Sequence, residues 1–142
     1  MRTASYLPQL FTVFVVSAAA AAQAPWGFPI ERQFVATTIN GQAIGSKPPT
    51  LTITRDPKNH TLLAAGFAGC NRWSGAVSLG QLHFGVGNLG TTKMYCADKM
   101  AAESDFLSTL RAVKHWHMQG TTLVLEGQTA SLEWVPADSM PR

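Results

Sequence analysis

The sequence predicts a mainly β (α+β) fold: a small antiparallel barrel-like or strongly curled sheet of about eight strands with one amphipathic helix. Three observations predict it. Apolar and polar residues alternate in short segments over most of the chain, which is the period of strands with one buried face. Glycines and turn-forming pairs separate these segments at short intervals, which favours antiparallel neighbours. Only one segment has helical period, and a sheet of this size reduces its exposed edges by curling or closing.

The first 22 residues have the pattern of a secretory signal peptide. Arg2 supplies the positive charge, residues 10–16 form a short apolar stretch, and an alanine run follows up to Ala22. The apolar core is shorter than the ~20 residues of a membrane-spanning helix, which disfavours the alternative of an uncleaved anchor. We therefore expect residues 1–22 to be removed, with the cut near Ala22, and the mature chain to be periplasmic or secreted without a membrane span.

The leader and the first strands follow in order along the chain. Residues 23–31 contain two prolines and a glycine and are expected to be an irregular leader. Asn40-Gly41 marks a tight turn after the first alternating segment, and Gly80 marks a turn after the fourth. The strands expected before the helix lie at residues 34–39, 50–54, 60–66, 73–79 and 81–84.

A helix is expected over residues 98–113, where apolar residues recur at helical spacing. Ala102, Phe106 and Leu110 form its predicted buried face, and Asp98 is its predicted N-cap. The strands expected after the helix lie at residues 114–119, 121–126 and 129–135.

Length and composition limit the partners of the chain. One domain is expected at residues 32–136, followed by a polar tail at residues 137–142, because no linker or repeat marks a second unit. Apolar residues make up 46% of the chain, which excludes wholesale disorder. The 11 basic and 8 acidic residues nearly balance, and the basic ones are scattered, which argues against a nucleic-acid partner.

The chain contains two cysteines, Cys70 and Cys96, and both lie after the predicted signal. An even count in an exported chain favours a disulfide between them. Two buried free thiols, or a metal site shared with histidines, are the alternatives. The metal alternative is the weaker one because neither a C-x-x-C pair nor a cluster of cysteine and histidine at zinc-finger spacing occurs.

Two motifs resemble the signatures of one family, the META/HslJ domain family. The segment Gly69-Cys70-Asn71-Arg72-Trp73-Ser74-Gly75 resembles its G-C-N-[RK]-aromatic-x-G signature, and Thr92-Lys93-Met94-Tyr95-Cys96 resembles its T-[RK]-M-x-C signature. Residues 103–110, which begin with Glu103, resemble the Glu-x-x-Phe-Leu-x-x-Leu helix of the family. The first strand departs from the pattern, because Phe34 stands where the family often has Trp.

The resemblance implies a small β-barrel-like fold of lipocalin-type topology in an extracytoplasmic protein. Members of the family are linked to heat shock, envelope stress, drug tolerance or virulence, and no catalytic activity is established for the family as a class. We therefore expect a non-catalytic domain that supports envelope stress tolerance by binding a small molecule or an envelope protein. A small-ligand carrier using the barrel interior and an unrecognised hydrolase are the alternatives.

The two motifs also contain the residues that we predict as candidates for a binding site. The binding candidates are Asn71, Arg72, Trp73, Thr92, Lys93 and Met94. A structural interpretation competes with this one: the glycines permit a bend, Trp73 and Met94 fill the core, and Asn71 satisfies backbone groups at the bend.

The remaining sequence patterns give little indication of metal binding or catalysis. His115 and His117 point to the same face of a strand, but two histidines with no evident acid rarely make a specific metal site, so neither a metal nor a cofactor is expected. There is no G-x-S-x-G motif, no spacing that indicates an acid–base pair and no phosphate-binding glycine loop. We therefore expect no catalytic residues.

Overall fold

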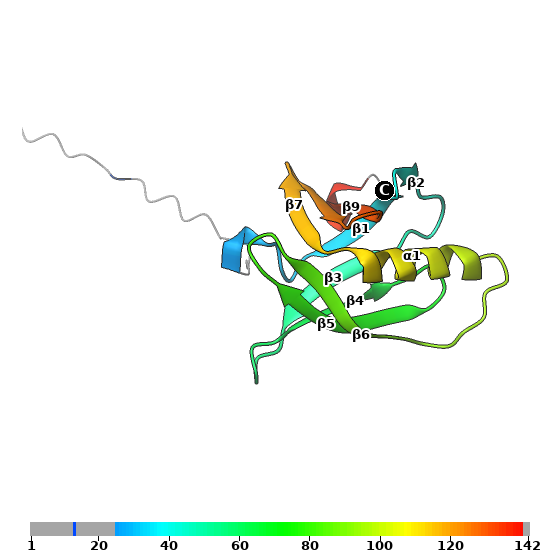
Figure 1. Cartoon of the computed structure of the whole chain (residues 1–142), viewed down its shortest axis with the longest axis horizontal. Helices are drawn as coiled ribbons and strands as arrows, with labels where there is room; N and C mark the ends of the chain where they lie inside the picture. Colours follow the sequence, from blue (N-terminus) through cyan, green and yellow to red (C-terminus); the bar gives the residue numbers. More distant parts are fainter. Residues whose placement is uncertain (1–12, 14–24, 141–142) are drawn as a thin grey trace, which may run out of the picture.

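The computed structural model describes Val13 and residues 25–140, and one antiparallel sheet curls there around a single helix (Figure 1). Eight strands follow the order β6-β5-β4-β3-β1-β9-β8-β7, and the short β2 pairs only with β1. The strands are β1 (Gln33–Ile39), β2 (Gln42–Ala43), β3 (Thr50–Arg55), β4 (Leu62–Phe67), β5 (Arg72–Leu79), β6 (Phe84–Thr91), β7 (His115–Gln119), β8 (Thr122–Glu126) and β9 (Ser131–Pro136). The helix is α1 (Met100–Ala112), and short 3-10 turns lie at η1 (Pro25–Gly27) and η2 (Ala137–Ser139). The predicted fold class, a mainly β fold with a barrel-like or strongly curled antiparallel sheet of about eight strands and one helix, is confirmed, and the sheet forms a half-barrel.

The core lies between the inner face of the sheet and α1. Strand residues alternate between the two faces, so that Leu51 and Ile53 are buried while Thr52 between them faces outward. Phe106 of the helix contacts Trp73 of β5 and Trp134 of β9 edge to face, with ring centroids 6.0 and 5.9 Å apart. These contacts hold the helix inside the curl, and the outer face of the sheet is left to solvent.

The sheet closes at one corner only. There the backbone amide of Phe84 donates to the carbonyl of Lys114, and the amide of Trp116 donates to the carbonyl of Leu82, at 2.9 and 3.0 Å. His83 and His115 are the bridged pair between these bonds. Beyond this corner β6 and β7 separate, which makes the fold a half-barrel.

The irregular leader is part of the core. Phe28 is only 1% exposed, and its ring packs on Phe84 and Trp116 with centroids 5.9 and 4.9 Å apart. The amide of Glu31 donates to the carbonyl of Ile53. The segment before β1 therefore covers the closed corner, although its sequence has no strand period.

Two elements differ from the predictions. β6 runs over Phe84–Thr91 and not over residues 81–84, because glycines at 85, 87 and 90 hide its alternation. The helix begins at Met100 with Lys99 as its N-cap, so Asp98 does not cap it. Ala102 is exposed, and Glu103 lies on the buried face in its place.

The predicted signal peptide at residues 1–22 and its cleavage site lie outside the described residues, apart from Val13. Within the described part of the chain, no helix is both long enough and apolar enough to cross a bilayer.

Candidate functional site

The predicted disulfide between Cys70 and Cys96 is present. Their Cα atoms are 5.9 Å apart, and the bridge joins the β4–β5 turn to the segment before α1. It ties together the two motifs that carry the family resemblance. It also points to an oxidising, extracytoplasmic environment.

Asn71, next to the bridge, uses its whole side chain inside the protein. Its carbonyl oxygen accepts from the hydroxyl of Thr92 at 2.9 Å and from the amide of Met94 at 2.6 Å. Its amide nitrogen donates to the carbonyl of Met94 at 3.0 Å and to the carboxylate of Glu103 at 2.8 Å. These four bonds use every donor and acceptor site of the amide group. Asn71 therefore holds the loop that contains the second motif, and it has no free group for a ligand.

Glu103 is the buried acid that completes this arrangement. One carboxylate oxygen accepts from the backbone amides of Cys70 and Asn71, and the other accepts from the side chain of Asn71. Burial by itself raises the pKa of Glu103, but these hydrogen bonds favour the charged form more strongly, so that its pKa lies below its usual value. The sequence carries one signal for this role: a charged residue three and four positions before Phe106 and Leu107, on the buried face of the helix.

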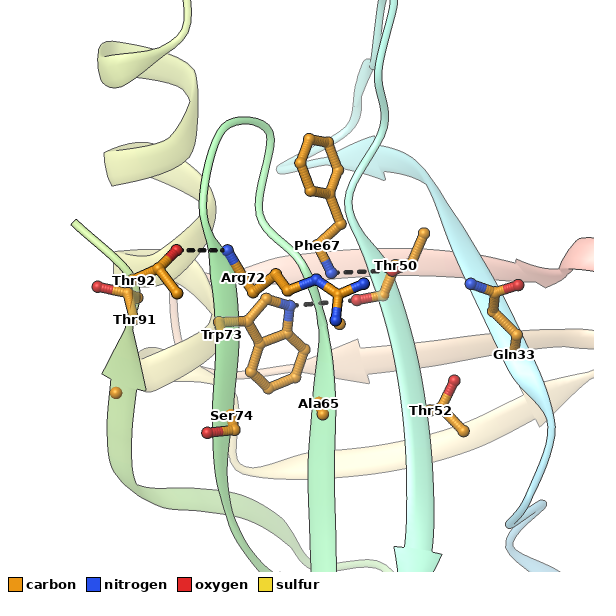
Figure 2. A pocket seen from close by; sticks show the side chains of 12 residues that line it. Gln33, Thr50, Thr52, Ala65, Phe67, Arg72, Trp73, Ser74, Thr91 and Thr92 are labelled. Atoms are coloured by element: carbon orange, nitrogen blue, oxygen red, sulfur yellow. Dashed lines mark hydrogen bonds between the residues drawn. The ribbon is translucent and has the colours of Figure 1, made fainter. Parts of the chain in front are cut away.

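Arg72 and Trp73 point to opposite faces of β5. Trp73 is buried in the core, and its indole nitrogen donates to the carbonyl of Thr50 at 3.2 Å. Arg72 is exposed on the outer face, and its guanidinium makes no hydrogen bond or ion pair with any residue between 25 and 140. In Figure 2 its side chain extends across β4 toward Thr50.

A groove of about 900 Å³ crosses the outer face of the sheet beside Arg72 (Figure 2). Its floor is a single cross-strand row, in which each residue pairs with the next: Gln33, Thr52, Ala65, Ser74 and Gly90. The middle of this row has small side chains, which is why the surface is hollow there. Five hydrogen-bonded strands support it, so the floor is rigid.

The neighbouring row forms one wall of the groove. Arg72 pairs with Phe67, whose amide donates to the hydroxyl of Thr50 at 2.9 Å. On the other side of Arg72, Thr92 contributes a hydroxyl that accepts from the amide of Arg72 at 3.1 Å. Thr91 also lines the groove. The wall thus presents one cation among hydroxyl groups.

The six binding candidates from the sequence divide into three groups. Arg72, Trp73 and Thr92 border the groove, but the ring of Trp73 is buried on the inner face, and Asn71 holds the neighbouring loop from beneath. Lys93 and Met94 lie on the exposed surface of that loop and do not line the groove. Met94 is 57% exposed, so the interpretation of this residue as core filler is wrong.

The histidines lie away from the groove. His117 has an acidic neighbour that the spacing did not reveal: its Nδ1 is 3.3 Å from the Oε1 of Glu126. His115 pairs with the same glutamate in the strand register. Among residues 25–140 and Val13, no group of three or more His, Cys, Asp or Glu side chains is arranged to hold a metal ion.

A second hollow, of about 540 Å³, lies between the β1–β2 hairpin and α1. Asn40, Gln42, Asp105 and Ser108 supply its polar groups. Asn40 is partly engaged already, because its side chain contacts Thr109 at 3.5 Å and accepts from the amide of Ser131 at 2.9 Å. The groove beside Arg72 is the stronger candidate, since its cation has no partner in the described part of the chain.

Comparison with known proteins gives a family and a fold. The model of a family described as META domain matches residues 29–139, close to the domain predicted at residues 32–136. A protein from Burkholderia xenovorans, solved by NMR, is 23% identical with a TM-score of 0.60, covering 76% of this chain and 83% of its own. A second NMR structure is 24% identical with a TM-score of 0.58, covering 78% of this chain and 92% of its own. Both comparisons show similarity of the fold alone. Among curated proteins none matches this chain.

Proposed function

Because this chain belongs to the META domain family, a family of small β proteins, we propose that it is a non-catalytic binding domain acting outside the cytoplasm. It takes a small polar molecule, or a polar segment of an envelope protein, in the groove beside Arg72. Such binding supports tolerance of envelope stress. The observation that carries the proposal is the guanidinium of Arg72, which has no partner among residues 25–140, beside a floor of mostly small side chains.

The location has two supports. The disulfide between Cys70 and Cys96 is typical of an oxidising compartment. The first 22 residues have the charge, length and alanine run of a secretory signal. Together they favour a periplasmic or secreted protein.

A carrier that holds its ligand inside the barrel is less well supported. Such a carrier needs an enclosed apolar cavity. Here Trp73, Phe106 and Trp134 pack against one another between the sheet and the helix, and each is at most 2% exposed. The described interior is thus occupied by the side chains of the protein itself.

A hydrolase is also less well supported by the groove. Proton transfer between an enzyme and its substrate commonly uses two positioned titratable groups. Arg72 is the one ionisable side chain among the described residues that line the groove, and arginine stays protonated. The lining therefore suits binding better than acid–base chemistry.

The test compares two substitutions on the outer face of the sheet. Ala65→Phe fills the groove floor, and Ala76→Phe adds the same ring at an exposed position outside the groove. Each protein, expressed from the full-length gene, is purified from the cell envelope and its bound molecules are identified by mass spectrometry. We expect a molecule that accompanies the wild type and Ala76→Phe but is lost from Ala65→Phe.

Thermal melts of all three proteins control for folding. Equal recovery of the molecule with Ala65→Phe would place binding elsewhere and contradict the proposal. Absence of any molecule that depends on the groove would contradict it too.

A further inference from the structure

We infer that the ligand of the groove is a polyhydroxylated anion, namely a sugar unit that carries one carboxylate or phosphate group. The inference rests on the proposed function, because it names the chemical class that the same groove takes. Three features of the groove carry it: its single charge, its unused hydroxyl and amide groups, and its length.

The charge of the groove selects an anion. Among the described residues that line the groove, Arg72 is the only one with a charged side chain, and none of them is Asp or Glu. Its guanidinium has no protein partner between residues 25 and 140, so its donors are free. The planar fork of arginine matches the two oxygens of a carboxylate or phosphate. One cation binds one such group without repulsion from a neighbouring acid.

The polar groups of the floor suit hydroxyl-rich ligands. The side chains of Thr52, Ser74 and Gln33 make no hydrogen bond with described residues, and the hydroxyl of Thr91 is equally unused. Hydroxyl and amide groups both donate and accept, as do the hydroxyls of a sugar. The hydroxyls of Thr50 and Thr92, in contrast, already bind backbone groups. The free groups therefore lie along the floor, where the body of the ligand would rest.

The shape of the groove fits an extended molecule. Its floor spans five strands, and neighbouring strands lie about 4.8 Å apart, so the row is roughly 19 Å long. Arg72 stands on the wall next to Ser74 and not at the centre of the floor. A ligand with an anionic group at its side and a polar body along the row can contact both the guanidinium of Arg72 and the polar groups of the floor.

Two other classes of ligand fit less well. A peptide that adds a strand lies along a sheet edge, whereas the groove crosses the face of the sheet, and of its five strands only β6 is an edge strand. A nucleic acid is held by many phosphate contacts to lysine and arginine, whereas the groove has one arginine. The sugar anion remains the class that uses all the free groups.

The experiment is an NMR titration of the full-length protein, following the backbone amides of Ala65, Ser74 and Gly90. The probes are uronic acids (glucuronate and galacturonate), glucose 6-phosphate, neutral glucose, and the small anions acetate and inorganic phosphate. We expect at least one sugar anion to shift these amides with an affinity about tenfold or more above that of glucose and of the small anions. The uronate and phosphate arms distinguish the two sources of the charge.

Arg72→Gln and Arg111→Gln form the matched pair for this titration. Both remove one exposed arginine charge, but Arg111 lies at the end of α1 and does not line the groove. We expect Arg72→Gln to weaken sugar-anion binding about tenfold and Arg111→Gln to leave it unchanged. Equal losses in the two variants would reduce the effect to general charge and overturn the inference.

The remaining outcomes separate the inference from the proposed function. If neutral glucose binds as tightly as the sugar anions, the charge is not required and the inference is wrong. If acetate or inorganic phosphate binds as tightly as the sugar anions, the hydroxyl groups are not required and the inference is also wrong. If no sugar anion shifts the groove amides while an envelope extract that contains both small molecules and soluble proteins does, the inference fails and the proposed function stands. If the extract leaves them unshifted too, both fail.

Discussion

The side-chain amide of Asn71 donates a 2.8 Å hydrogen bond to the carboxylate of Glu103, and both residues are buried. This bond connects the β4–β5 turn to the helix beside the disulfide. The same carboxylate accepts the backbone amides of Cys70 and Asn71. The turn therefore depends on a single acidic residue of α1 for three of its donors.

Removing this carboxylate is expected to destabilise the protein strongly. Glu103→Ala leaves three buried donors without their acceptor, and each such loss costs about 1–3 kcal/mol, so we expect the free energy of unfolding to fall by about 3 kcal/mol or more. Urea unfolding measures it. Glu126→Ala, which removes an exposed acid, should change it by no more than about 1 kcal/mol. Similar values for the two variants would show that the buried bonds contribute little.

The lowered pKa of Glu103 predicts an acid-sensitive fold. A carboxyl group whose pKa is lower in the folded state stabilises the fold above its unfolded pKa, about 4.3, and this stabilisation is lost as the pH falls through the folded pKa. We expect wild-type stability to decline over this acid range. Glu103→Gln should be less stable at neutral pH and show a shallower decline, as measured by urea unfolding between pH 7 and pH 3. Parallel curves for the two proteins would contradict the assignment.

Reduction of the disulfide is expected to lower the melting temperature. The bridge closes a loop with a sequence separation of 26, which corresponds to a stabilisation of roughly 3–4 kcal/mol in the chain-entropy model. We expect a decrease of about 10 °C or more on adding reductant, read by circular dichroism. A Cys70→Ala, Cys96→Ala double variant should melt at the lower temperature with or without reductant. A wild-type melting point unaffected by full reduction would refute the stabilising role.

Replacing Gly66 of β4 and Gly87 of β6 by alanine is expected to change the stability of the protein by different amounts. A Cβ at Gly66 would overlap the backbone carbonyl of Thr50, while a Cβ at Gly87 meets no atom within 4 Å. Gly66→Ala should therefore reduce the free energy of unfolding by about 2 kcal/mol or more, and Gly87→Ala should change it by less than about 1 kcal/mol. Urea unfolding distinguishes these results, and a tolerated Gly66→Ala would show that β3 and β4 can move apart.

The fold was predictable because most strands keep a regular alternation, as in β3, where Leu51 and Ile53 are buried and Thr52 between them faces outward. The two cysteine motifs and the helix added the family resemblance. β6 was misplaced because glycines carry no side chain to reveal a face. The order of the strands was not readable, since nothing local in the sequence indicates that β1 lies beside β9.

The candidate site was only partly predictable. Arg72 and Thr92 were identified from their motifs, but the groove beside them also needs Gln33, Thr52 and Ala65 from other strands. These residues meet only through the register of five paired strands, which a single sequence does not contain. The contact between His117 and Glu126 was missed for the same reason.

The pairing of β1 with β9 places the first and last strands of the domain side by side in the interior of its sheet, with Val35 opposite Val135. During synthesis from the N-terminus, β1 therefore leaves the ribosome before the other strands of the domain and β9 leaves after them. Until residues 131–136 arrive, the strands on either side can meet at the corner near Phe84 and Trp116 but not through β1 and β9. Because this pairing joins residues about 100 positions apart, we expect it to form late and to slow the folding of the domain.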